Sequence, residues 1–476
     1  MMIIATIVLA ANIVSFKDAD KIKSWDAWDD HKAKVSITNI LQKEKRCVTW
    51  EKLNKLDPGL KESGRLAVRE SKDIKSSKWS VGCETMDRDY ADWDSFKALL
   101  PGLGVKHARF FSGWAKTEQE KGVCDFTWLD PHIRECAAMG IKPWICISYG
   151  NPVWGSDFRL GMRVKQVSEN PEALAAWLRY TKALVARYKD VVDEWEIWNE
   201  PFGQGQEYSE FVYATAKAVR EVQPEAKCLV ACMAWWDDMK DYRAVAEKLK
   251  RENALDLVKY WVVHPYDPNP DTSYRQCYEP LKRLIAEYSP DWEVVQGEVG
   301  CPSQLEYAHA MCNNEWTEYS QAKWLLRRAV GDAVRSVPSN IFTMIDLKYT
   351  FMLQSYGLVR SNLLKEFVYR RPSYYAMSNV FNLLDDDAKP LDVETRKCGS
   401  REITRARFTR GNEELSFFWF SDAMPSNELV FEKVDLKAAF GLDGAATWTD
   451  MITGRVFELG DVKSVPLWDS PVLIRR

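Results

Sequence analysis

Eight short apolar runs alternate with helix-forming stretches through the middle of the chain. The runs have the length of buried strands and occupy residues 79–84, 105–111, 141–148, 192–198, 227–233, 257–264, 292–298 and 340–347. The stretches that follow them space their apolar residues like one face of a helix, as at 171–188. Eight such repeats predict an α/β chain folded as a (β/α)8 TIM barrel. The rival, a doubly wound open sheet, would usually carry a glycine-rich phosphate turn after an early strand, and the sequence has none.

The two ends of the chain depart from this rhythm. Short strands separated by polar turns are expected near residues 401–408, 415–420, 429–434, 446–450 and 465–474. They predict a small β-sandwich domain at 385–476 beside a barrel at 77–384. Residues 1–76 form an N-terminal segment whose candidate strands, at 33–40 and 46–50, would join that sandwich. Residues 1–16 are apolar and uncharged, and they fit either a signal peptide or a first strand.

Composition argues against several classes of protein. Lys and Arg number 65 against 69 Asp and Glu, so the basic excess expected of a nucleic-acid binder is missing. The apolar run at 1–16 is short for a membrane span. An export signal is therefore the one membrane-related function expected of this segment. Periplasmic or extracellular and cytoplasmic locations both remain open, as does the oligomeric state. The 21 Trp, 19 Tyr and 19 Phe supply flat apolar faces that suit sugars.

Motifs for metals, nucleotides and other hydrolases are missing from the sequence. It contains no His-x-x-x-His pair or Cys/His cluster, so no metal site is expected. It contains neither a nucleotide loop nor a Gly-x-Ser-x-Gly elbow, so no cofactor and no serine triad are expected. The eleven cysteines are an odd number, and whether Cys301 and Cys312 pair is left open.

Two glutamates stand at the carboxyl ends of expected strands, where a barrel of this kind places its active site. Glu200 follows the fourth strand, and Glu298 closes the seventh, 98 positions later. These two strands face each other across a closed ring of eight. Paired carboxylates across a cleft suit the cleavage of a glycosidic bond, because one attacks the anomeric carbon while the other protonates the leaving oxygen. The plainer alternative gives each glutamate a structural ion pair.

The sequence around both glutamates resembles that of the retaining glycoside hydrolases of clan A. Trp-Asn-Glu-Pro at 198–201 is similar to their acid/base signature, Gln-Gly-Glu-Val-Gly at 296–300 to their nucleophile strand, and His-Pro-Tyr at 264–266 to their His-x-Tyr feature. Within the clan, the group of β-xylosidases and α-L-iduronidases is the most similar. The resemblance implies double displacement on a β-linked glycan or oligosaccharide, exo-acting and β-xylosidase-like, with no metal or organic cofactor. An endo-acting glycanase and a non-catalytic carbohydrate-binding barrel stay open as alternatives.

The resemblance also implies individual roles. Glu200 would be the general acid/base and Glu298 the nucleophile. Asn199 would bind the sugar 2-hydroxyl, and Arg109 would keep Glu298 ionised and oriented. Tyr266 would donate to Glu298, and His264 would line the glycone subsite, although it could equally be a core histidine.

Other strand ends supply further candidates for substrate binding: Tyr149, Asn151, Trp114, Asp346 and Lys348. Trp114 fits core packing equally well. Many clan members carry a Trp platform after strand eight, but this chain has Asp-Leu-Lys-Tyr at 346–349. Asp346 or Lys348 would therefore contact sugar hydroxyls, or a substrate carboxylate in the case of the lysine, unless the two simply pair with each other.

Overall fold

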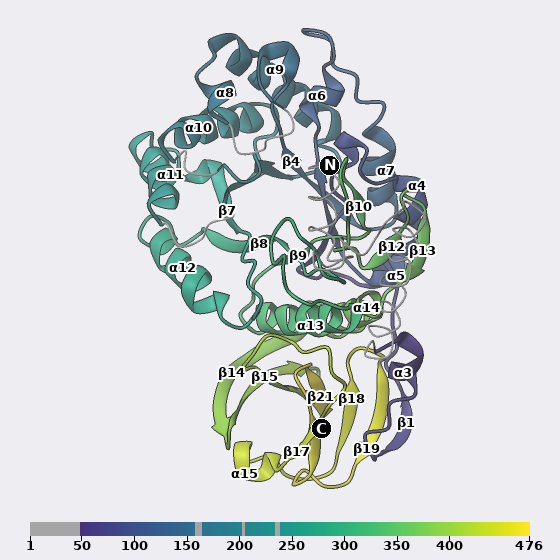
Figure 1. The fold of residues 1–476 in the computed structure, drawn as a ribbon. Helices are drawn as coiled ribbons and strands as arrows, with labels where there is room; N and C mark the ends of the chain where they lie inside the picture. Colours follow the sequence, from purple (N-terminus) through teal and green to yellow (C-terminus); the bar gives the residue numbers. More distant parts are fainter. Residues whose placement is uncertain (1–47, 158–163, 202–204, 234–238) are drawn as a thin grey trace, which may run out of the picture.

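A closed barrel of eight parallel strands forms the centre of the molecule (Figure 1). The computed structural model describes residues 48–157, 164–201, 205–233 and 239–476. The barrel strands, in order around the ring, are β2 (Trp79–Gly82), β3 (His107–Phe111), β4 (Lys142–Ile147), β5 (Glu194–Ile197), β6 (Lys227–Met233), β7 (Val258–Val263), β8 (Glu293–Val299) and β9 (Ser339–Ile341). The predicted (β/α)8 barrel with an additional antiparallel domain is confirmed.

Helices cover the outside of the ring (Figure 1). The longer ones are α7 (Asp130–Ala138), α9 (Pro171–Tyr188), α10 (Gly205–Val222), α11 (Met239–Arg251), α12 (Glu279–Ala286), α13 (Glu318–Val334) and α14 (Pro372–Leu383). Shorter turns are α4 (Trp93–Phe96), α5 (Leu100–Leu103), α6 (Trp114–Thr117) and α8 (Lys165–Ser168). The start of α9 shows the local cause: Asn170 caps the backbone N–H groups of Glu172 and Ala173, and Pro171 fits the first turn.

The last barrel strand is shorter than predicted. The expected strand at 340–347 ends at Ile341, although Phe342 still donates to the carbonyl of Val299 on β8 at 2.9 Å. Met344 still donates to the carbonyl of Gly82 at 2.9 Å, but it accepts from Val359 at 3.0 Å instead of pairing with β8. Two hairpins follow, β10 (Leu347–Lys348) with β11 (Leu353–Gln354) and β12 (Val359–Ser361) with β13 (Phe367–Arg370). The apolar sequence continues past the end of the strand because loops bury these residues. Apolar residues therefore indicated burial at this position, not strand structure.

A seven-stranded antiparallel sheet and a two-stranded one form the C-terminal unit (Figure 1). The larger sheet has the order β1 (Lys61–Arg65), β19 (Arg455–Leu459), β18 (Ala446–Asp450), β21 (Val472–Arg475), β16 (Glu413–Phe420), β15 (Arg401–Arg410) and β14 (Ala388–Cys398). The smaller sheet pairs β17 (Glu432–Val434) with β20 (Val465–Leu467), and α15 (Leu436–Phe440) lies between them in sequence. Strand β1 comes from the N-terminal segment and pairs with β19.

Two N-terminal expectations do not match described strands. Residues 1–16 and the candidate strand at 33–40 lie outside the described part of the chain. The candidate strand at 46–50 reaches it only at its end, where Trp50 begins helix α3 (Trp50–Asn54) instead. The Thr49 side chain accepts from the Lys52 backbone N–H, which is the N-cap that starts this helix.

Helix α13 joins the two units (Figure 1). Its barrel face and its sandwich face are both covered, so its charged residues Lys323, Arg327, Arg328 and Asp332 are buried. Lys323 on this helix donates to Asp469 at 2.6 Å, and Arg327 donates to the carbonyl of Ala423 at 2.8 Å. These contacts satisfy the buried cations and seat the sandwich against the barrel.

Two sequence questions receive an answer from the described residues. None of their helices is both long and apolar enough to span a bilayer. Cys301 and Cys312 are both free thiols.

Candidate active site

A cavity of about 760 Å³ lies at the carboxyl ends of the barrel strands. Its volume falls in the range of ligand pockets. Both predicted catalytic glutamates face it, and the full lining is Glu84, Thr85, Arg88, Phe111, Tyr149, Asn199, Glu200, Tyr266, Glu298, His309, Ala310, Met311, Phe342, Tyr349, Gln354 and Tyr356. The location agrees with the rule that chemistry in this fold occurs at the carboxyl ends of the strands.

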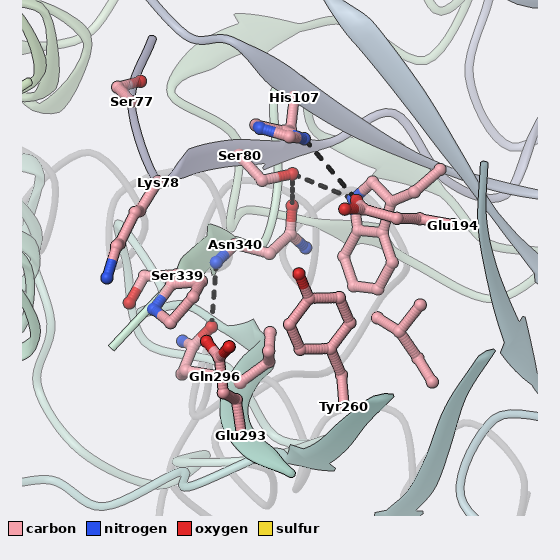
Figure 2. A pocket seen from close by; sticks show the side chains of 14 residues that line it. Ser77, Lys78, Ser80, His107, Glu194, Tyr260, Glu293, Gln296, Ser339 and Asn340 are labelled. Atoms are coloured by element: carbon pink, nitrogen blue, oxygen red, sulfur yellow. Dashed lines mark hydrogen bonds and ion pairs between the residues drawn. The ribbon is translucent and has the colours of Figure 1, made fainter. Parts of the chain in front are cut away.

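A second, smaller cavity of about 160 Å³ lies at the opposite end of the barrel (Figure 2). It is lined by residues at or near the start of strands, among them Ser80, His107 and Ser339. His107 lies 3.6 Å from Glu194, and Ser80 donates to Asn340, as the dashed lines in Figure 2 show. This end of a barrel usually serves stability rather than catalysis.

Arg109, on β3, connects several side chains beneath the main cavity by hydrogen bonds. It is fully buried and donates two hydrogen bonds of 2.7 Å to Glu196, one from Nε and one from Nη2. Its Nη1 donates to Glu298 at 2.8 Å, and its Nη2 also donates to Asn199 at 2.7 Å. One guanidinium therefore fixes side chains from β5 and β8 relative to each other, as charge-assisted hydrogen bonds do well.

Glu298 is held in an ionised, oriented state. Tyr266 donates to its Oε1 at 2.9 Å while Arg109 occupies Oε2. Burial raises the pKa of Glu298, but the charges of His264 and Arg109 and these hydrogen bonds outweigh burial, so its pKa lies below the usual range. Burial keeps the pKa of Tyr266 well above its usual value, so that hydroxyl stays a donor. An ionised carboxylate at a cavity wall can act as a nucleophile.

Glu200 sits on a backbone turn that directs it into the cavity. Trp198 and Glu200 both have positive φ, 67° and 53°, a region that non-glycine residues rarely adopt. Such conformations cost about 1–3 kcal/mol each and cluster at functional sites. His264 is fully buried, and its Nδ1 lies 3.0 Å from Oε1 of Glu200. His264, which was expected to line the glycone subsite, is not among the described residues that line the cavity, and it contacts the lining residue Glu200.

The two glutamates lie close together. Glu200, His264 and Glu298 each place one potential ligand atom within 4.8 Å of the others. This spacing could hold a metal ion as far as distance alone is concerned. However, both oxygens of Glu298 already accept hydrogen bonds, and the Arg109 cation beside them opposes a second positive charge.

Asn199 and Tyr149 lie beside the glutamates. Asn199 accepts from Arg109 and donates from Nδ2 to the Tyr149 hydroxyl at 2.8 Å. These bonds fix the orientation of the amide at the cavity wall. Both residues line the cavity, as the sequence-based hypothesis expected of substrate-binding side chains.

The other four sequence candidates do not line the cavity. Trp114 is fully buried and donates to Glu118 at 2.6 Å, and Asn151 is buried and donates to the carbonyl of the same Glu118 at 2.7 Å. Asp346 is held by two hydrogen bonds from Arg371, of 2.6 and 2.8 Å. Lys348 donates to the carbonyl of Tyr349 at 2.7 Å. These two lie beyond the barrel because strand eight ends early.

Comparison with known proteins identifies solved structures that share this architecture. No protein-family profile matches the chain. Its structure is similar to a family 39 glycoside hydrolase from Bacteroides cellulosilyticus, with a TM-score of 0.62, 18% identity, and 85% of this chain and 81% of that one covered. It is also similar to a monomeric β-xylosidase from Caulobacter crescentus, with a TM-score of 0.56, 14% identity, and 87% and 97% covered. The fold is that of the family 39 glycoside hydrolases. The resemblance drawn from the sequence is thus confirmed at the level of the fold.

Several site residues were missed by sequence reasoning. Glu196 lies inside β5, where its inward direction depends on the register of the ring. Arg88 lies in the one-turn helix η3 (Met86–Arg88) after β2, where no periodicity points to it. Glu84 does follow the first strand, and its place at that strand end was the one signal that could have identified it.

Proposed function

We propose that this protein is a retaining glycoside hydrolase that cleaves a β-linked glycan or oligosaccharide by double displacement. The observation that carries the proposal is the approach of Glu200 and Glu298 in one cavity, with carboxylate oxygens no more than 4.8 Å apart. Retaining enzymes separate their two carboxyl groups by about 5–5.5 Å, whereas inverting enzymes need roughly 6.5–9.5 Å to admit a water molecule. The short separation favours retention.

The contacts assign a role to each side chain. Glu298 attacks the anomeric carbon, while Glu200 gives its proton to the leaving oxygen. The glycosyl–Glu298 ester is then hydrolysed by a water molecule that Glu200 deprotonates. Tyr266 and Arg109 keep the nucleophile ionised and aligned before attack. Asn199 faces the cavity with its amide fixed by Arg109 and Tyr149, which suits a contact to the sugar 2-hydroxyl.

The cavity walls support exo action. His309 and Met311, from the segment after β8, and Tyr349 and Tyr356, from the segment after β9, form walls of the cavity that holds the two glutamates. Walls of this kind fit a chain end better than the middle of a long polymer. Similarity to β-xylosidases makes a β-xyloside the reference substrate for the glycone. An endo-acting enzyme would require the same residues and a cavity open at both sides.

The deciding experiment combines a panel of 4-nitrophenyl glycosides with three variants. Glu298→Gln and Glu200→Gln should each lower kcat/KM, the first by more than about 10³-fold and the second by about 10²–10⁴-fold. The matched control is Glu306→Gln, a buried glutamate that does not line the cavity and whose Oε1 accepts from Ser355. Sugar anomers followed by NMR should show retention. A wild type that hydrolyses no glycoside, yet binds sugars, would favour the non-catalytic alternative.

A further inference from the structure

Arg88 lines the main cavity from the loop after β2 and is largely desolvated. Its side chain is 11% exposed. The guanidinium carbon lies 5.1 Å from the ring centre of Tyr149, 5.3 Å from that of Phe111 and 5.4 Å from that of Tyr90. Three aromatic rings thus hold the cation in one orientation by cation–π attraction.

The hydrogen bonding of Arg88 is incomplete. Its Nε donates to Asp87 at 3.3 Å, a long contact. Its Nη1 and Nη2 donate to no acceptor in the part of the chain that the structure describes. A guanidinium has five N–H donors, and buried polar groups are normally satisfied. Arg371, which is fully buried, shows the usual pattern, with two bonds to Asp346 and a further one to a carbonyl.

The charges around the cavity make the free Nη1 and Nη2 donors of Arg88 informative, because its ion pair with Asp87 uses Nε alone. Among the described lining residues, the other ionisable side chains that carry charge near neutral pH are carboxylates, since burial lowers the pKa of His309. Hydroxyl groups of a neutral sugar can be bound by amides and tyrosines, which the cavity already provides. A fixed guanidinium with two free N–H edges is suited instead to a planar anion, which it binds through two parallel hydrogen bonds.

We propose that Arg88 binds a carboxylate carried by the sugar in this cavity, so that the substrate is a uronide, a glycoside of an acidic sugar. The inference rests on the proposed function and refines its glycone. Tyr149 links the two ideas, because it contacts Arg88 on one side and accepts from Asn199, the expected partner of the glycone 2-hydroxyl, on the other. A xyloside has no carbon at position 6 and so no carboxylate for Arg88, which sets this proposal apart from β-xylosidase-like specificity.

The test compares matched pairs of aryl glycosides that differ only in the acidic group. The pairs are 4-nitrophenyl β-D-glucuronide with β-D-glucoside, and β-D-galacturonide with β-D-galactoside; the β-D-xyloside and a 6-sulfated glucoside complete the set. The wild type should hydrolyse the acidic member of at least one pair with the higher kcat/KM. Arg88→Gln should reduce that acidic-to-neutral ratio by about tenfold to hundredfold, the usual worth of a charge-assisted pair. Arg88→Lys should retain part of the preference.

Matched controls and the opposite outcomes complete the design. Arg134→Gln removes a guanidinium that is paired with Asp190 on the outer face of α7, and it should leave the ratio unchanged. Preference for the neutral member of both pairs, or for the sulfated sugar over the uronide, would overturn the proposal. So would a ratio that survives in Arg88→Gln. Because the wild-type ratio needs no variant, a folding defect in Arg88→Gln does not remove the test.

A binding measurement separates this inference from the catalytic proposal. Calorimetry with D-glucuronate, D-galacturonate and their neutral counterparts does not depend on turnover. If no glycoside is hydrolysed but a uronate binds more tightly than its neutral counterpart, the catalytic proposal fails and the Arg88 site stands. If neutral glycosides are hydrolysed and neither uronate binds more tightly, the Arg88 site is refuted and the glycosidase stands.

Discussion

Glu84 and Glu298 accept hydrogen bonds from the same nitrogen atom, Nη1 of Arg109, at 2.8 Å each. Burial, reinforced by repulsion from Glu298 and only partly offset by Arg109, raises the pKa of Glu84 well above its usual range. The pKa of Glu298 is lowered, because the charges of His264 and Arg109 outweigh its burial. Glu84 therefore keeps its proton over a pH range in which Glu298 is ionised. Of these two carboxyl groups, Glu298, the proposed nucleophile, therefore carries the negative charge.

This difference predicts that Glu84→Gln is mild. A neutral amide of the same shape replaces a carboxyl group that is already protonated, with its oxygen toward Arg109 and its NH₂ in place of Oε2, an atom without a protein partner. We expect kcat/KM to stay within about threefold of the wild type, compared with a fall of more than about 10³-fold for Glu298→Gln. Steady-state kinetics on the best aryl glycoside measures both. Equal losses in the two variants would show that Glu84 works as an anion.

The Tyr266 contact predicts a shift in pH dependence. The hydroxyl donates to Glu298 and is one of the groups that lower the pKa of this carboxyl. In Tyr266→Phe the pKa of Glu298 should rise by about one unit, the worth of one hydrogen bond to a charged group. Because the nucleophile must be ionised, kcat/KM falls as pH drops through this pKa, so the acidic limb should move to higher pH.

A control separates this effect from the loss of any buried tyrosine hydroxyl. Tyr180→Phe removes a hydroxyl that donates to the carbonyl of Ser112 at 2.9 Å, outside the cavity lining. Its acidic limb should coincide with that of the wild type. A Tyr266→Phe profile with lower kcat but an unmoved limb would mean that the hydroxyl contacts substrate instead of tuning Glu298.

The parts of the site that were predictable from sequence share one physical cause. Glu200 lies just after β5 and Glu298 near the end of β8, and parallel strands of a closed ring bring their carboxyl ends to one rim. Local sequence carries that information. The interior of the ring is different, because whether Glu196 points inward toward Arg109 depends on strand register across β3, β4 and β5. Arg88 likewise reaches the cavity only through the path of an irregular loop.

The same distinction explains the errors in the fold. Residues 342–347 were predicted as strand because they are mostly apolar, and all of them are buried, but after Phe342 and Met344 the chain bonds to Val359 on β12 instead of to the barrel strands. Strand β14 was missed for the opposite reason. Its eleven residues include Lys389, Asp392, Glu394, Arg396 and Lys397, and no apolar face repeats along it. A charged edge strand is held in place by backbone hydrogen bonds to its neighbour, here β15. Such backbone pairing does not require a repeating pattern of apolar residues, so the sequence does not reveal it.

Metal removal is expected to leave the proposed hydrolytic activity unchanged. Glu200, His264 and Glu298 come within 4.8 Å of one another, but the hydrogen bonds of Arg109 and Tyr266 already use both oxygens of Glu298. After dialysis against a chelator, kcat/KM should match that of the untreated protein. Added Zn²⁺ should inhibit, since an ion at these carboxylates would occupy the nucleophile. Activity that vanishes on chelation and returns with metal would contradict the proposed mechanism.

The last prediction concerns the junction between the barrel and the sandwich. Asp385, just after α14, accepts from Arg410 on β15 at 2.6 and 3.0 Å and from Arg69 at 2.7 Å. Burial raises its pKa, but the bonds from the two arginines outweigh burial, so the pKa is lowered on folding. A lowered pKa contributes stability that is present above the unfolded value, about 3.9, and is lost as pH falls through the folded value.

Asp385→Asn should therefore destabilise the protein in a pH-dependent manner. At pH 7 we expect a loss of about 1–3 kcal/mol in the free energy of unfolding, measured by urea titration, because two guanidinium groups lose a charged partner. The difference from wild type should shrink steadily below about pH 4, as the wild-type carboxyl takes up its proton. Asp387→Asn, at a side chain 75% exposed, is the matched control and should cost less than about 0.5 kcal/mol. A difference that stayed constant down to pH 3 would show that Asp385 contributes through shape rather than charge.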